Sequence, residues 1–464
     1  MRALQLGLGI VCLVGVALAA CSSSPKPTSF HADIAPIVQS RCQSCHHDGG
    51  IAPFSLVSYD DLRSRGHLAL SNVTSRTMPP WGAFDSPECK LKRPLADDLR
   101  LTDAEVATFE KWVNEGMVEG DPASAPAPKQ FTTAAFTATN DYGIIKPFGL
   151  KAGTLDTIRC FPIDPGFTQD VWIAGSNVVP GDPRVVHHVI VYQDPNGEGP
   201  AKADETGSYS CFGGPGVSNT SLMVAWAPGV PPASYGENAG MKLKKGSRLV
   251  LQVHYHPAAV GQDAVDATRF QLRVLQERPR YVTQIVLIGN AENADGIVKL
   301  LPSADDPPAG PAFLIPANKT GHVESMTLTV PEKLGSAYVP TMKLFALGAH
   351  MHWAGVDMKI EIDRAHPTEE QPPNECLLQT AKYDFNWQRA YAYTGDYDTL
   401  PEIGPNDRLK FTCTYNNTTN NRYITKALSE QRLSSPVDIH LGETTLDEMC
   451  LGAFVLMRPV SAFD

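Results

Sequence analysis

Two patterns of apolar and polar residues divide this chain. A helix is predicted from about residue 101 to Gly116, because apolar residues recur at helical spacing after a capping signature that runs from Thr102 to Glu105. From about residue 148 the pattern changes to short runs rich in Val, Ile and Thr, separated by Gly, Pro, Asn and Asp, which predicts strands and few helices. The clearest predicted strands are 185–192, 248–255, 270–274, 323–330, 342–347, 358–362 and 408–414. Such spacing is typical of antiparallel β-sandwiches.

Composition adds a boundary between the two parts. Residues 120–128 are rich in Pro and Ala and lack apolar periodicity, as expected of a linker. The 464 residues, 42% hydrophobic and 19% charged, are enough for about three globular domains, and no internal repeat is evident. The net charge of -11 is spread along the chain, which argues against a nucleic-acid partner.

The first residues predict export and a lipid anchor. A short basic start precedes the apolar run 4–18, which is too short and too rich in Gly for a membrane span. Leu-Ala-Ala-Cys, ending at Cys21, resembles a bacterial lipoprotein cleavage box. We therefore expect a signal peptide at 1–20, lipidation of Cys21 and a tether at 21–30. The absence of Asp after Cys21 favours, by resemblance to known lipoproteins, the periplasmic face of the outer membrane of a Gram-negative bacterium.

A Cys-x-x-Cys-His motif at 42–46 predicts covalent attachment of a c-type haem. The thiols of Cys42 and Cys45 lie about one helical turn apart, as needed to add to the two vinyl groups, and His46 is then the proximal iron ligand. The alternatives for such a pair are half a zinc site or a redox dithiol. The chain contains no second Cys-x-x-Cys, which argues against zinc.

The residues downstream of this motif favour haem. Met78 lies in Arg-Thr-Met-Pro-Pro-Trp, where two prolines stiffen a loop that presents a thioether to the distal side of the iron. His67 and His47 are alternative distal ligands. The capped helix near residue 101 resembles the C-terminal helix of a small cytochrome c. We therefore expect an all-α cytochrome c domain at 31–119 and a linker at 120–147.

Three histidine motifs occur in the β-rich part. The histidines of each motif are either metal ligands or ordinary buried, hydrogen-bonded residues. Residues two apart on a strand point to the same face, so His350 and His352 can bind one metal ion, copper or zinc, together. The neighbours His187 and His188 would face opposite ways on a regular strand. Joint binding by this pair requires a β-bulge or a strand end. The third motif is His254-Tyr255-His256.

The order of five motifs resembles the copper type II, ascorbate-dependent monooxygenases, the family of dopamine β-monooxygenase and peptidylglycine α-hydroxylating monooxygenase. The motifs are His187-His188, His254-Tyr255-His256, His350-Met351-His352, Phe411 to Asn416, and Asp447-Glu448-Met449-Cys450. The resemblance covers about residues 148–464. It implies two all-β jelly-roll sandwich domains, 148–280 and 281–464, with one copper site each.

The resemblance also implies ligands and disulfides. The electron-transfer copper would be held by His187, His188 and His254, and the oxygen-binding copper by His350, His352 and Met449. Imidazoles suit copper cycling, and a thioether favours Cu(I). Alternatively, Met449 is an ordinary methionine of the hydrophobic core. The family uses the first histidine of its His-Tyr motif, which argues against His256. Implied disulfides are Cys160–Cys211 and Cys413–Cys450, which leaves Cys89 and Cys376 either joined or as two free thiols.

The expected function is a copper-dependent monooxygenase that hydroxylates a C–H bond of a small organic substrate with O2. Its electrons would come from a periplasmic donor, through the fused haem, with ascorbate as a further candidate reductant. Peptide-amidating members carry an Arg and a Tyr where this chain has Gly348 and Ala453, which argues against peptide amidation. The aromatic residues Trp353, Trp387 and Tyr415 are candidates for a pocket lining or for the core.

Two non-catalytic functions compete with this expectation. A periplasmic lipoprotein with haem and copper would also serve in electron transfer or copper handling. A structural zinc protein with an attached cytochrome is the third alternative. It is disfavoured because neither predicted ligand set contains the thiolates usual in closed zinc sites.

Overall fold

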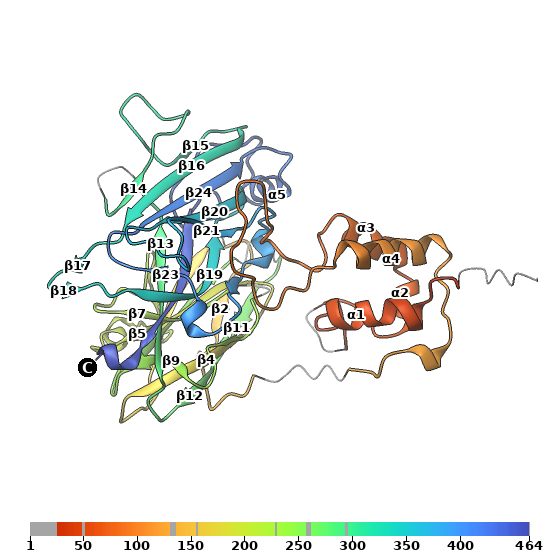
Figure 1. Cartoon of the computed structure of the whole chain (residues 1–464). Coiled ribbons are helices and arrows are strands. Elements are labelled where there is room, and N and C mark those ends of the chain that lie inside the picture. The colour runs from red at the N-terminus through yellow and green to blue at the C-terminus, as the bar shows by residue number, and fades with distance from the viewer. Residues whose placement is uncertain are drawn as a thin grey trace, which may run out of the picture.

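The structure is a computed structural model. It describes residues 26–48, 52–129, 136–154, 156–227, 230–256, 261–292 and 296–463. A small helical part lies beside a larger β part (Figure 1). None of the helices in these ranges is long and apolar enough to cross a membrane. The predicted signal peptide and Cys21 lie outside the described residues.

The helical part packs around one core that includes Phe30, Phe109 and Trp112. Its helices are η1 (Phe30–Ile34), α1 (Ala35–Arg41), α2 (Tyr59–Arg63), α3 (Gly66–Thr74) and α4 (Asp103–Asn114), followed by η2 (Pro122–Ser124). The predicted helix near residue 101 is α4. It begins with a capping box in which Thr102 and Glu105 each accept the other's backbone N–H. The sequence pattern therefore predicted both its start and its apolar face.

The first β unit contains two packed layers of strands around one core. One layer is β1 (Asn140–Gly143), β12 (Arg269–Leu275), β4 (Val171–Val179) and β9 (Ala239–Leu243), with β8 (Ala233–Ser234) on β4. The other is β7 (Ser221–Trp226), β5 (Val186–Asp194), β10 (Arg248–Tyr255), β3 (Thr157–Ile163) and β6 (Tyr209–Ser210). The separate pair β2 (Phe148–Leu150) and β11 (Ala264–Asp266) and the short helix η3 (Gly199–Lys202) complete it.

The second β unit is also layered. One layer is β13 (Tyr281–Gly289), β26 (Leu451–Pro459), β19 (Met342–His350), β22 (Ala390–Ala392) and β23 (Glu402–Ile403). The other is β14 (Val298–Leu300), β16 (Thr320–Thr329), β24 (Arg408–Asn416), β20 (Gly355–Asp363) and β21 (Asn374–Gln379). Peripheral elements are β15 (Leu314–Ile315), β25 (Ile439–His440), β17 (Lys333–Leu334), β18 (Ala337–Tyr338), α5 (Arg422–Gln431), η5 (Phe385–Trp387), η6 (Tyr397–Thr399) and η7 (Val460–Phe463). Each predicted strand is present, as β5, β10, β12, β16, β19, β20 or β24.

Strand β26 joins the two units. Along it, Phe454 and Leu456 pack into the core of the second unit, whereas Val455 and Met457 pack into the core of the first unit. This follows from the alternation of side chains along a strand, and it requires a strand that is apolar on both faces. The two units therefore share one continuous sheet, through β13 and its parallel pairing with β9.

Residues 81–97 leave the helical part and pack on the second β unit. Trp81 is 4% exposed within the core of that unit. A disulfide joins Cys89 to Cys376 on β21, and Arg93 forms a buried ion pair with Glu375. The sequence prediction had placed 31–119 in one helical domain. Apolar burial, a disulfide and an ion pair instead attach the middle of that segment to the β unit, so more than a linker connects the two parts.

Candidate metal centres

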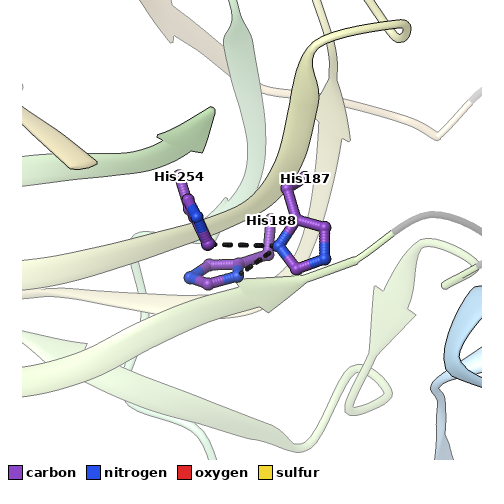
Figure 2. Close-up of side chains that lie close together, drawn as sticks. All are labelled: His187, His188 and His254. Atoms are coloured by element: carbon purple, nitrogen blue, oxygen red, sulfur yellow. Dashed lines mark hydrogen bonds between the residues drawn. The ribbon is translucent and has the colours of Figure 1, made fainter. Parts of the chain in front are cut away.

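Three histidines of the first β unit converge. His187 and His188 lie on β5 and His254 on β10, and their candidate ligand atoms all lie within 4.8 Å of one another. Figure 2 shows the three rings directed toward one point. The Nδ1 atom of His187 lies 3.1 Å from Nδ1 of His254 and 3.3 Å from Nδ1 of His188. A metal ion about 2 Å from each nitrogen holds its ligand atoms roughly 3–4 Å apart, so the spacing fits one ion.

A β-bulge brings the adjacent histidines together. Pairing between β5 and β10 shifts register here: His254 pairs with His188, but Tyr255 pairs with Val186. His187 is therefore an extra residue in its strand. A bulge of this kind redirects a side chain and is what joint binding by neighbouring residues requires.

Asp156 orients His254. The His254 Nε2–H donates to Asp156 Oδ1 at 3.0 Å, which leaves Nδ1 directed toward His187 and His188. Although burial alone would raise the pKa of Asp156, hydrogen bonds from His254 and His256 bring that pKa well below its ordinary value. The carboxylate is therefore ionised, the usual partner of a metal-binding imidazole. No motif in the sequence identifies Asp156.

The same carboxylate connects the two β units. Oδ2 of Asp156 accepts the backbone N–H of Thr445 at 3.0 Å and its hydroxyl at 2.5 Å. His256 donates Nδ1–H to Oδ1 of Asp156 at 2.7 Å, while its Nε2 lies 3.0 Å from Glu430 on α5. Both ring nitrogens of His256 thus make hydrogen bonds with carboxylates, those of Asp156 and Glu430. This is expected of a histidine that positions neighbouring side chains and does not itself bind a metal ion.

Burial favours the neutral imidazole at the first cluster. It lowers the pKa of His187 and of His188 well below the ordinary value, and the neighbouring histidines lower both further. Metal binding requires the neutral ring, so these histidines need not lose a proton near neutral pH.

A second pair of histidines lies where β19 ends. The His350 and His352 ring centroids are 5.2 Å apart. His350 donates Nδ1–H to the side-chain oxygen of Gln388, and His352 donates Nδ1–H to the carbonyl of Asp447 at 2.9 Å. Each ring therefore keeps Nε2 for a metal ion. Gln388 is a functional neighbour that the sequence did not reveal.

A fully buried carboxylate holds the segment that carries Met449. Glu448 is 0% exposed and accepts four backbone N–H groups. The donors are His352 at 2.7 Å, Ala354 at 2.6 Å, Gly355 at 3.2 Å and Met449 at 3.1 Å. Burial raises the pKa of Glu448 to about 8, although these hydrogen bonds oppose the shift. The carboxyl group thus binds the His352 segment to the Met449 segment.

The two clusters open onto one cavity of about 1170 Å³. His187, His188, His350, His352 and Met449 all line it. Of the aromatic candidates, Trp353 lines this cavity, whereas Tyr415 is buried and donates its hydroxyl to the Met449 carbonyl at 2.8 Å. Trp387 ends η5 and is not part of the described lining.

The Cys-x-x-Cys-His residues form a turn after α1. Cys42 and Cys45 are both free thiols, and burial, followed by the charge of Cys45, raises the pKa of Cys42 to about 12. His46 donates Nδ1–H to the Phe54 carbonyl at 3.1 Å, which leaves Nε2 for a ligand. Met78 is 36% exposed, at the surface after α3.

The other candidates for the distal position differ in environment. His67 is exposed, and His47 is buried with Nδ1 2.9 Å from the Asp48 carbonyl.

Six cysteines form three disulfides. Cys160–Cys211 and Cys413–Cys450 are paired as the resemblance implied. Cys450 directly follows Met449, so the second bond anchors its loop to β24. Cys89–Cys376 is the third, at the pair that the sequence left undecided.

The chain has partial similarity to two curated proteins. It is 32% identical over 105 residues to peptidyl-glycine alpha-amidating monooxygenase A of Xenopus laevis, and 31% identical over 105 residues to monooxygenase B of the same organism. Each match covers 22% of this chain and only 11% of the relative. A solved structure of T=1 particles derived from infectious bursal virus aligns over 69% of this chain and 76% of its own at 8% identity, but its TM-score of 0.09 carries no argument. No protein-family model matches the chain.

Substitution of Asp156 by Asn tests its orienting role. The amide keeps the size but removes the charge that holds His254, so affinity of the first cluster for Cu(I) is expected to fall about 10- to 100-fold. Competition titration against a chromophoric chelator measures this. Asp141→Asn is the control, because that carboxylate pairs with Arg269 on β12, outside the cluster. Equal affinity of Asp156→Asn and wild type would refute the assignment.

Proposed function

We propose that this chain is a copper-dependent monooxygenase that hydroxylates a C–H bond of a small organic substrate with O2. The observation that carries the proposal is the opening of a three-imidazole cluster and a pair of imidazoles with a thioether onto one cavity. The partial similarity to monooxygenases supports this class of chemistry. The layered β units support a β-sandwich architecture, and the motif order implies that it takes the form of two jelly-roll domains.

The donor sets fit copper. His187, His188 and His254 would hold one ion, and His350, His352 and Met449 the other. Imidazole and thioether donors favour copper over hard cations, and bound copper supplies one-electron redox chemistry and activation of O2. The protein's own part is to orient His254, His350 and His352 through Asp156, Gln388 and the Asp447 carbonyl, while burial lowers the pKa of His187, His188, His350 and His352.

Cys42, Cys45 and His46 would hold a c-type haem, with Met78 as the distal ligand. Two free thiols and a His46 ring oriented by the Phe54 carbonyl fit that group. Bound haem supplies one-electron transfer from a periplasmic donor, or from ascorbate. Residues 81–97 would keep this electron source beside the second β unit, because Cys89–Cys376 and the Arg93–Glu375 ion pair attach them there.

The proposed location is the periplasmic face of the outer membrane, with a lipid on Cys21. The signal-like start and the cleavage box motivate this. After expression in a Gram-negative host, wild type is expected in the membrane fraction and Cys21→Ala in a soluble or unprocessed form. Equal distribution of the two forms would rule out the anchor.

A second function is favoured by one observation. Gly348 and Ala453 are paired neighbours on β19 and β26, so the wall beside His350 carries no polar side chain at either position. A protein of this fold that no longer binds and hydroxylates a substrate would serve instead in electron transfer or copper handling. The hydrogen bonds that orient His254, His350 and His352 favour the enzyme.

Removal of the thioether separates the two functions. Met449→Leu conserves volume but deletes the soft ligand, so substrate-dependent O2 uptake by copper-loaded, haem-loaded protein is expected to fall at least tenfold, or about 1.4 kcal/mol of barrier. An oxygen electrode measures uptake across a substrate panel. Met241→Leu, in the core of the first β unit, is the matched control. Equal, substrate-independent uptake in wild type and Met449→Leu would favour the non-catalytic function.

Covalent attachment of haem can be tested without measuring enzyme turnover. Wild type produced with haem-attachment enzymes is expected to retain haem after denaturation, whereas the double variant Cys42→Ser, Cys45→Ser retains none, because thioether bonds can no longer form. Met78→His is expected to keep the haem and lower its midpoint potential, since a Met ligand raises it. The double variant Cys89→Ser, Cys376→Ser is the control for cysteine loss. Denatured wild type without haem would overturn the assignment.

A further inference from the structure

Four adjacent strands present one face to the cavity beside His350. Strands β13, β26, β19 and β22 are paired in that order, and their backbone register aligns one residue from each. Leu287 pairs with Ala453, Ala453 with Gly348, and Gly348 with Ala390. All four line the cavity, and we name them the floor row.

The floor row lies directly beside the second cluster. His350 is two residues beyond Gly348 on β19 and pairs with Leu451, so it points from the same face in the next row. The row on the other side is also apolar and lines the same cavity: Ile285, Val455, Ala346 and Ala392. His350, a candidate metal ligand, thus lies at the edge of an apolar surface.

The floor row is flat because its central side chains are small. A Cβ placed on Gly348 would lie 3.5 Å from Cβ of Ala453 and 3.4 Å from the Arg389 carbonyl. Any larger side chain at Gly348 would have to project into the cavity. Three interstrand spacings of about 4.8 Å give the row a length of roughly 14 Å.

Among the cationic side chains of the described lining, Arg184, Arg422 and Lys426 have carboxylate partners, whereas Arg389 stacks on aromatic rings and its buried Nε has no hydrogen-bond partner among the described residues. Arg184 pairs with Asp182 at 2.6 Å, Arg422 with Asp384 at 2.8 Å, and Lys426 with Glu430 at 3.6 Å. The Arg389 guanidinium lies 4.7 Å from the ring centroid of Trp81 and 5.4 Å from that of Tyr391. Tyr391 belongs to the core of the second unit, so this stacking directs Arg389 toward that core.

We propose that the floor row binds an uncharged, apolar part of the substrate and places it beside His350. The proposal rests on the proposed function and names its substrate class: a neutral molecule with an alkyl or aryl portion. A charged group on the row would lose its hydration against apolar side chains, whereas an apolar chain loses only water contacts. Specificity here follows from the apolar side chains of the floor row and of the row beside it.

Binding to copper-free protein tests this without turnover. The probes are 1-octanol, octanoate and octylammonium, which share one chain and differ in head-group charge. Titration calorimetry is expected to show 1-octanol bound at least about tenfold more tightly than either ion. Octanoate or octylammonium bound as tightly as the alcohol would overturn the proposal.

Two variants locate the binding. Gly348→Leu fills the centre of the floor row, and Ala390→Leu fills its exposed end; each is expected to weaken 1-octanol binding at least about tenfold and to leave Cu(I) binding unchanged. Gly149→Leu on β2 is the control, because a Cβ there meets open space. Wild-type binding of 1-octanol by both floor variants would overturn the proposal. Because the 1-octanol titrations use copper-free protein, a failed oxygen-uptake test would leave their outcome intact.

Discussion

The structure depends on one strand that is apolar on both faces. Strand β26 carries Phe454 and Leu456 into one core and Val455 and Met457 into the other, so neither β unit can rotate without breaking both cores. Burial of apolar surface is the dominant favourable term in folding, and here it also fixes the distance between the two clusters. The cavity exists because this shared sheet continues past the packed region and leaves the rest of its face open.

Hydrogen bonds accepted by two carboxyl groups, those of Asp156 and Glu448, position the segments next to β19 and β26. Asp156 accepts a hydrogen bond from His254 of the first cluster and another from Thr445 in the loop that leads to Met449. Glu448 then joins that loop to the His352 segment. Asp156 and Glu448 therefore connect the histidines of the two clusters through one loop, and each of these two carboxyl groups accepts several hydrogen bonds. A buried hydrogen-bond network is rigid when every donor and acceptor in it has a partner, and such rigidity keeps the histidine rings in fixed orientations.

The attachment of residues 81–97 changes how the helical part relates to the rest. A Pro- and Ala-rich linker alone would leave that part free to sample many positions. Burial of Trp81 and the Cys89–Cys376 bond remove most of that freedom. Direct contact adds to this, since Lys382 donates to the Ser75 carbonyl at the end of α3 at 2.8 Å. A source of electrons in the helical part would thus have a defined approach to the second β unit.

The sequence by itself determined the local elements and identified the histidine motifs. Short runs rich in Val, Ile and Thr predicted the strands, and helical spacing with a capping box predicted α4. Joint metal binding by His187 and His188 required a bulge or a strand end, and the structure has a bulge there. These features depend on neighbours along the chain, which a sequence displays directly. Only the tertiary structure decided the rest: Asp156 beside His254, Gln388 beside His350, the Cys89–Cys376 bond and the floor row. Each of these joins residues far apart in the chain, and their meeting is set by strand register and by the packing of two cores, which no local pattern encodes.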